Sequence, residues 1–217
     1  MVRLLGVMDT PNPPDIESQA PAASPFIDGM ATGSFGIRLA GRLIDTLVGA
    51  AMGFVGGIVG VVGAGILAAM GQVESNWLEK IQSSGGGFVA SALWGGLASL
   101  LYHSVSEGVG GTSVGKLILG FRVVREDLRP VGFGSALIRS LAYFVDAFFF
   151  GMPAYQAMQD GPYNQRLGDK WGKTVVIKAT AIPENLRRST GLMLLGLACG
   201  MSAQALVMAL SMISKVM

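Results

Sequence analysis

Three long stretches of the sequence are apolar and nearly free of charge. The first contains a single charged residue, Asp45, and the other two contain none. Uncharged apolar runs of about 20 residues are long enough to cross the hydrocarbon core of a bilayer as α-helices. The pattern therefore predicts three membrane-spanning helices, over about residues 43–70, 88–106 and 191–213.

A fourth apolar segment, residues 133–158, is interrupted by Gly151 and Pro153. The segments on either side of it, residues 107–132 and 160–188, are both rich in Lys and Arg. Basic loops favour the cytoplasmic side, so a full crossing by the segment between them is disfavoured. We expect a re-entrant or interfacial helical hairpin kinked at Pro153, with both ends cytoplasmic. This gives three spans, with the N-terminus inside and the C-terminus outside; a four-span bundle remains the alternative.

The other polar segments complete the organisation. Residues 1–34 are rich in Pro, Ser, Ala and Gly without periodicity, which is typical of a flexible tail, here expected in the cytoplasm. Residues 117–124 have the composition of a short strand, followed by a turn at 126–130. The predicted fold is an all-α membrane protein: a helical bundle of three to four transmembrane helices with a re-entrant or kinked segment and a short cytoplasmic β element.

The composition agrees with a membrane protein and excludes several other classes. Of the 217 residues, 51% are hydrophobic and 14% are charged, against about a quarter charged residues in soluble domains. The lone cysteine, Cys199, cannot form an intrachain disulfide, which excludes a disulfide scaffold. The net charge of +2 is too small to indicate a nucleic-acid partner.

Arg38, Arg42 and Asp45 share one face of a helix at the start of the first span, because they are spaced by four and three residues. This places Asp45 near the cytoplasmic boundary of the bilayer. A carboxylate so close to hydrocarbon is costly unless it is paired, and Arg42 is the expected partner. Two interpretations stay open: an anchor that fixes the register and orientation of the helix, or an ion or proton site.

Two further charge groups follow along the chain. Arg139 and Asp146 repeat the spacing of seven residues, and Asp146 needs either Arg139 or a basic group from another segment as its partner. The repetition indicates either a weak internal duplication, as in many transporters, or a chance similarity between two apolar helices. Arg166, Asp169 and Lys173 also share one helical face, where solvated surface charge is the default interpretation.

Three blocks in this order, FGIRLAGRLID, TSVGKLILGFRVV and NQRLGDKWGKTVV, resemble the RDD family of membrane proteins, which is named for one arginine and two aspartates. The resemblance covers roughly residues 35–178. It implies that Arg38 and Asp45 are the first arginine and aspartate, that Arg139 is a further family arginine, and that Asp169 is the second aspartate. It also implies a membrane location in a bacterium, and cation/proton exchange has been proposed for some members.

Two features depart from the family pattern. Lys170 and Trp171 replace an apolar pair after the second aspartate, and the segment 179–217, a linker and an additional C-terminal transmembrane helix, lies outside the RDD-like membrane domain. If the family charges converge at the cytoplasmic membrane surface, they form a partly buried cluster. Such a cluster either locks helices together or binds a small ion.

The first span also carries small residues on one face. The glycines repeat at intervals of four and three and include the close-approach GxxxG spacing. Their expected partner is the second span, through Gly95, Gly96 and Ala98, with the same helix of another copy as the alternative. The packing face consists of Gly49, Gly53, Gly56, Gly60 and Gly63.

Several catalytic motifs are incomplete. The stretch from Gly110 to Lys116 is similar to a phosphate-binding loop, but Leu117 stands where a Ser or Thr must hold Mg²⁺. His103, the only histidine, has no identifiable nucleophile elbow or orienting acid, and a metal site needs more ligands. We therefore expect an interfacial histidine, no catalytic residue, no metal or other cofactor, and no enzymatic activity.

These observations predict a small multi-pass protein of the bacterial inner membrane, with the lipid bilayer as its surroundings. The favoured function is a non-catalytic accessory or assembly subunit of a larger membrane complex. The alternative is a cation/proton transporter that works as a homo-oligomer, with Asp45, Asp146 and Asp169 as candidate carriers, since three spans of one copy hardly enclose a pathway.

Overall fold

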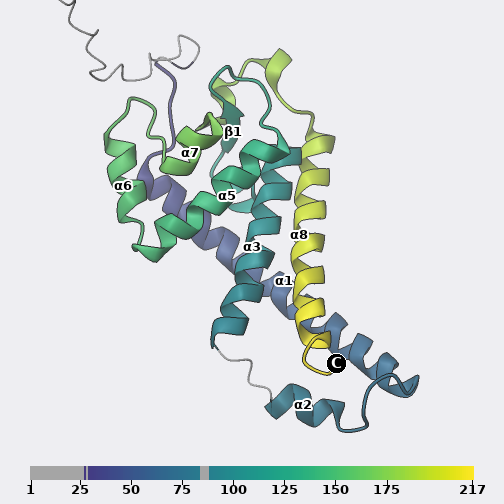
Figure 1. The fold of residues 1–217 in the computed structure, drawn as a ribbon. Coiled ribbons are helices and arrows are strands. Elements are labelled where there is room, and N and C mark those ends of the chain that lie inside the picture. Colours follow the sequence, from purple (N-terminus) through teal and green to yellow (C-terminus); the bar gives the residue numbers. More distant parts are fainter. Residues whose placement is uncertain (1–26, 28, 84–87) are drawn as a thin grey trace, which may run out of the picture.

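The computed structural model describes residue 27 and residues 29–83 and 88–217. Within these residues, three helices are long and apolar enough to cross a membrane: α1 (Phe35–Ala69), α3 (Phe88–Gly110) and α8 (Thr190–Ile213) together with the turn before it. α3 and α8 lie side by side along the length of the molecule, and α1 crosses them obliquely (Figure 1). The predicted helical membrane fold with three spans is confirmed.

Two of the spans extend beyond the apolar runs that predicted them. α1 begins at Phe35, so Arg38 and Arg42 lie in the same helix as Asp45, as their spacing predicted. α3 continues to Gly110, so Glu107 is a helical residue and not part of the basic loop. Both extensions carry polar side chains that find partners within the protein, which is why loss of hydrophobicity does not end the helix there.

The broken apolar segment forms two short helices, α5 (Phe133–Phe148) and α6 (Met152–Gln159), and neither is among the spanning helices of the described residues. The predicted kink at Pro153 was wrong, because Pro153 does not interrupt a continuous helix. It lies in the first turn of α6, where its missing N–H is not needed. The break is made by Gly151, whose φ of 79° places it in the left-handed region.

A small antiparallel sheet lies at the same end of the molecule as α5 and α6 (Figure 1). β1 (Phe121–Arg125) pairs with β2 (Thr174–Lys178), with Phe121 opposite Lys178. The predicted strand 117–124 is correct only in its second half, because α4 (Val114–Ile118), with Ser113 as its N-cap, and the turn after it occupy the first half. α7 (Leu167–Gly172) leads directly into β2.

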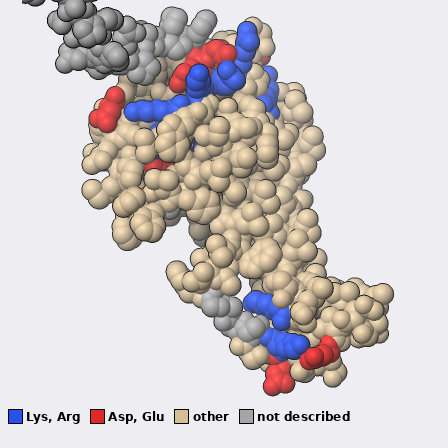
Figure 2. All heavy atoms as spheres, in the orientation of Figure 1, with Lys and Arg blue, Asp and Glu red and all other residues tan. Residues whose placement is uncertain are grey.

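The remaining elements are short. α2 (Trp77–Ser83) follows α1 at the opposite end of the molecule, and two 3-10 turns (Ala179–Ala181 and Glu184–Leu186) join β2 to α8. Lys, Arg, Asp and Glu side chains gather at these two ends, with an uncharged belt between them (Figure 2). This distribution is that of a protein whose middle lies in hydrocarbon.

The predicted partner of the glycine face of the first span was wrong. A Cβ at Gly60 would lie 2.7 Å from the carbonyl oxygen of Ala209 in α8, and one at Gly56 would overlap the carbonyl oxygen of Ala205. Gly57, on the neighbouring face, has no atom within 4 Å of such a Cβ. The close partner of α1 is therefore the last span, because α8 lies between α1 and α3 along this part of the bundle.

Candidate functional site

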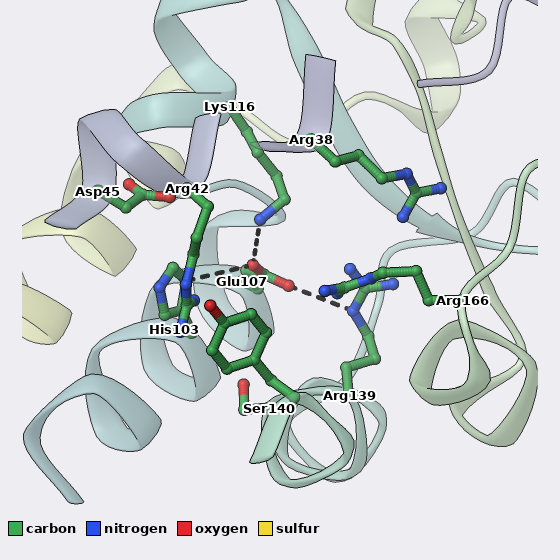
Figure 3. A pocket seen from close by; sticks show the side chains of 10 residues that line it. Arg38, Arg42, Asp45, His103, Glu107, Lys116, Arg139, Ser140 and Arg166 are labelled. Carbon is green, nitrogen blue, oxygen red and sulfur yellow. Dashed lines mark hydrogen bonds and ion pairs between the residues drawn. The ribbon is translucent and has the colours of Figure 1, made fainter. Parts of the chain in front are cut away.

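Charged side chains from five helices meet where the spanning helices reach the sheet. They surround a cavity of about 40 Å³, the size of one or two water molecules (Figure 3). Of the eight charged residues grouped by their spacing in the sequence, seven lie in this group or pair directly with a member of it, and Lys173 does not. We call the following residues the charge cluster: Arg38, Arg42, Asp45, Glu107, Lys116, Arg139, Asp146, Arg166 and Asp169.

Asp169 is fully buried at the start of α7 and lies among three arginines. Arg38 Nη1 lies 2.5 Å from its Oδ2, Arg139 Nη1 donates to its Oδ1, and the Arg166 Nε is 3.8 Å away. Burial alone would raise the pKa of this carboxyl, but Arg139, Arg38 and Arg166 hold it well below the ordinary value. The default interpretation of solvated surface charge was therefore wrong for Asp169. It is correct for Lys173, which is exposed.

Arg139 connects Asp169 to a second carboxylate, Glu107. Arg139 Nε lies 3.2 Å from Glu107 Oε2, and Lys116 Nζ lies 2.6 Å from Glu107 Oε1. Figure 3 shows Lys116 and Arg139 reaching Glu107 from different sides. With only 2% of its surface exposed, Arg139 is compensated by two carboxylates and by the hydroxyl of Thr174. Removing either carboxylate would leave a buried cation without a full partner.

Asp45 is bound by neutral donors and not by Arg42, which corrects the pairing predicted from their spacing. The hydroxyls of Tyr102 and Ser113 donate to its two oxygens at 2.9 and 2.7 Å, and the backbone N–H of Gly115 donates at 2.8 Å. Gly115 is required here because a Cβ at this position would overlap the backbone of α1 at Gly41. α4 therefore approaches α1 closely enough for a main-chain donor to reach Asp45.

Arg42 points instead into the space between α3 and α5. Its Nη2 donates to the Ser99 hydroxyl at 3.2 Å, and its guanidinium lies 3.7 Å from the centre of the Tyr143 ring. Within the described residues no carboxylate oxygen lies within 4 Å of it. Arg42 is thus held by a cation–π contact and one hydrogen bond, without a counter-ion.

Asp146 has a basic partner from another segment, one of the two options that its spacing left open. Arg166 Nη1 lies 3.8 Å from its Oδ2, whereas Arg139 is engaged with Asp169 and Glu107. Asp146 is 3% exposed, and its Oδ1 accepts no hydrogen bond from the described part of the chain. Burial raises the pKa of Asp146, and Arg166 opposes that rise.

Three members of this site were missed by sequence reasoning: Glu107, Lys116 and His103. Glu107 was assigned to a loop, and Lys116 was considered only as part of an incomplete nucleotide motif. His103 is 4% exposed rather than interfacial, with its Nδ1 3.5 Å from Glu107 Oε1. The available signal was the spacing of four residues between His103 and Glu107, which places both on one face of α3.

Apolar spans that meet a small sheet around buried arginines and carboxylates define a multi-pass helical membrane protein. The RDD family model matches residues 32–173, so the chain belongs to the RDD family. The resemblance seen in the three sequence blocks is thereby confirmed. α8 lies outside the matched residues.

Two mycobacterial proteins are similar to part of this chain. A "Proline-rich antigen homolog" of Mycobacterium tuberculosis is 38% identical over 89 residues, covering 38% of this chain and 35% of that protein. The "Proline-rich antigen" of Mycobacterium leprae is 34% identical over 80 residues, covering 35% of this chain and 30% of that protein. The matches therefore span about a third of each relative's length. No solved structure matches the chain.

Proposed function

We propose that this protein is a non-catalytic accessory or assembly subunit of a membrane complex in the bacterial inner membrane. The observation that carries the proposal is that three carboxylates of the charge cluster have both oxygens bound by donors of the protein itself. Asp169 accepts from two arginines and a backbone N–H, Glu107 pairs with Lys116 and Arg139, and Asp45 accepts three hydrogen bonds.

A carboxylate in this state is suited to joining helices rather than to carrying ions. Its lone pairs are directed at fixed donors, so a cation must displace an arginine or lysine in order to bind. The donors come from α1, α3, α4 and α5, and from the residue that precedes α7. The charge cluster thus holds the spanning helices and the sheet in one arrangement, which is the property required of a docking scaffold.

The same proposal includes an orientation in which the sheet and the charge cluster face the cytoplasm. Of the described Lys and Arg residues, only Lys80 and Lys215 belong to the opposite end. Cationic residues near the ends of spans favour the cytoplasmic side. This orientation puts the start of α1 inside the cell and the end of α8 outside it.

Asp146 supports one alternative, a proton or cation transporter that works as a homo-oligomer. Its Oδ1 is buried and accepts no hydrogen bond from the described residues, so it is the carboxylate oxygen of the charge cluster most available to a proton. Substituting Asp146→Asn removes this group while keeping its size, and Asp127→Asn provides an exposed control.

The test combines purification with transport. We expect the tagged protein, extracted in mild detergent from its own host, to carry a foreign subunit at fixed stoichiometry, and a tag on that subunit to recover this chain in return. Reconstituted alone into liposomes, the protein should move protons and Na⁺ no faster than empty vesicles do. A homo-oligomer whose ion flux is abolished by Asp146→Asn but not by Asp127→Asn would overturn the proposal in favour of transport.

A further inference from the structure

A larger cavity, of about 400 Å³, opens beside the charge cluster. It lies between the first turns of α1 and the break that separates α5 from α6. Its lining combines charged groups of the cluster with apolar side chains from the surface of the molecule. The residues that the argument uses are Arg38, Leu39, Arg42, Asp146, Phe150 and Arg166.

Two of the three arginines in this cavity leave most of their hydrogen-bond donors unused. Arg38 is engaged, because its guanidinium donates to Asp169 and to the backbone carbonyls of Gly33 and Asn164. Arg42 donates one hydrogen bond to Ser99, and the Arg166 guanidinium donates none within the described residues. A guanidinium carries five N–H donors, so this pair presents a largely unfilled set.

The charges of the cavity leave a net positive site. Asp169 neutralises Arg38, and Asp146 lies 3.8 Å from Arg166. Arg42 has no carboxylate within 4 Å in the described part of the chain, so its charge is the surplus. Arginine pairs bind the oxygens of phosphate groups by charge-assisted hydrogen bonds.

The remaining walls indicate where such a phosphate comes from. The side chain of Leu39 is 50% exposed and that of Phe150 is 97% exposed, and both belong to the cavity lining. Along α1 the next outward-facing residues, Leu43 and Leu47, are 60% and 72% exposed. A soluble phosphate would leave this apolar surface exposed to water, whereas the acyl chains of a lipid would cover it.

We propose that this cavity binds the headgroup of an anionic phospholipid, with its phosphate between Arg42 and Arg166 and its acyl chains against Leu39 and Phe150. The site lies at the first turns of α1, where this span meets the charge cluster, and such a boundary has the depth of lipid phosphates in a bilayer. This inference goes beyond the proposed function, since it needs the membrane location of the chain but no protein partner.

The test titrates the purified protein in detergent with two short-chain lipids that have the same acyl chains, phosphatidylglycerol and phosphatidylcholine. Bound lipid is counted by native mass spectrometry. We expect phosphatidylglycerol to bind at least tenfold more tightly than phosphatidylcholine. Arg42→Gln and Arg166→Gln should each weaken phosphatidylglycerol binding about tenfold, and Phe150→Ala should weaken both lipids.

Three controls keep the test decisive. Arg129→Gln removes an exposed arginine outside the cavity and should leave binding unchanged. Glycerol phosphate, the soluble headgroup, should not displace the lipid at equal concentration. The unfolding temperature of each variant is measured. Arg42→Gln carries the test if Arg166→Gln fails to fold, because the Arg42 side chain makes a single hydrogen bond within the described residues.

Equal binding of the two lipids would overturn the proposal, and so would an equal loss of affinity in the Arg42→Gln and Arg129→Gln proteins, which indicates diffuse surface attraction. If glycerol phosphate displaces the lipid, the ligand of the cavity is a free phosphate ester and not a lipid. None of these outcomes depends on whether the protein recruits a foreign subunit.

Discussion

The two halves of α1 are held by opposite kinds of contact. Near its start, Arg38 and Asp45 reach groups on other elements through ion pairs and hydrogen bonds. Further along, Gly56 and Gly60 present no side chain, and α8 approaches until backbone and Cβ atoms meet. A helix that enters hydrocarbon can thus be fixed by directional polar bonds at the boundary and by close backbone packing inside, where no hydrophobic drive between helices remains.

The strongest way to break the polar half is Asp169→Asn. The change leaves Arg38 and Arg139 without the carboxylate that compensates both, so we expect a loss of about 3–5 kcal/mol in the free energy of unfolding. Asp127→Asn, at an exposed carboxylate with partners at 3.6 and 3.8 Å, should cost less than about 1 kcal/mol. Thermal unfolding in detergent compares the two, and similar losses would contradict a central role for Asp169.

The packing half is tested by adding one methyl group to adjacent glycines. Gly56→Ala places a Cβ against the carbonyl of Ala205, so we expect a destabilisation of about 1–3 kcal/mol. Gly57→Ala meets no atom within 4 Å and should be neutral or slightly stabilising. Unfolding temperatures of the two variants provide the comparison. A larger effect at Gly57 would mean that this face is covered by another protein.

A smaller loss of stability is expected where a carboxylate in the polar half of α1 is bound by a neutral donor. Tyr102→Phe removes a hydrogen bond to Asp45 and the acceptor for the backbone N–H of Val114, at 2.9 and 3.0 Å. We expect a loss of about 1–2 kcal/mol, because the carboxylate keeps its other two donors. Tyr155→Phe is the matched control, since Tyr155 is half exposed. An unfolding temperature that does not differ between the two would argue against Tyr102 as a holding group.

Lowering the pH should weaken the ion pairs that hold the polar half of α1 and so lower the stability of the protein. Because the folded pKa of Asp169 lies well below the unfolded value of 3.8, its ion pairs contribute fully at higher pH and are lost as pH falls toward the folded pKa. We expect the unfolding temperature to be level from about pH 7 to 5 and to decrease below pH 4, with a shallower decrease in Asp169→Asn. Identical acid slopes in both proteins would assign the decrease to other carboxylates.

The sequence predicted the spans and the boundary charges well because both depend on local properties. Apolar run length gives the helices, and the spacing between Arg38 and Asp45 gives their shared face. Partner identity depends on the tertiary fold. Asp45 is bound by Tyr102 and Ser113, which are 57 and 68 residues away and carry no charge that would mark them. Pairing by proximity along the helix therefore selected Arg42 in error.

The predictions for the partner of the glycine face and for Glu107 were wrong for related reasons. A run of glycines predicts a close neighbour without naming it, and the last span was the less obvious choice because it follows the sheet in the chain. Glu107 follows an apolar helix and precedes a glycine-rich stretch, so its composition resembles a loop. In the folded protein, Lys116 and Arg139 neutralise it, and α3 can continue past it.

The position of α8 has one more consequence. The residues that match the RDD family end at 173, yet the groove at Gly56 and Gly60 is filled by a helix that begins at Thr190. A chain cut after residue 178 would retain its arginine–aspartate pairs but expose bare backbone to lipid. Supplying residues 179–217 as a separate peptide should restore the stability of the truncated protein, because the groove on α1 that receives α8 is already present.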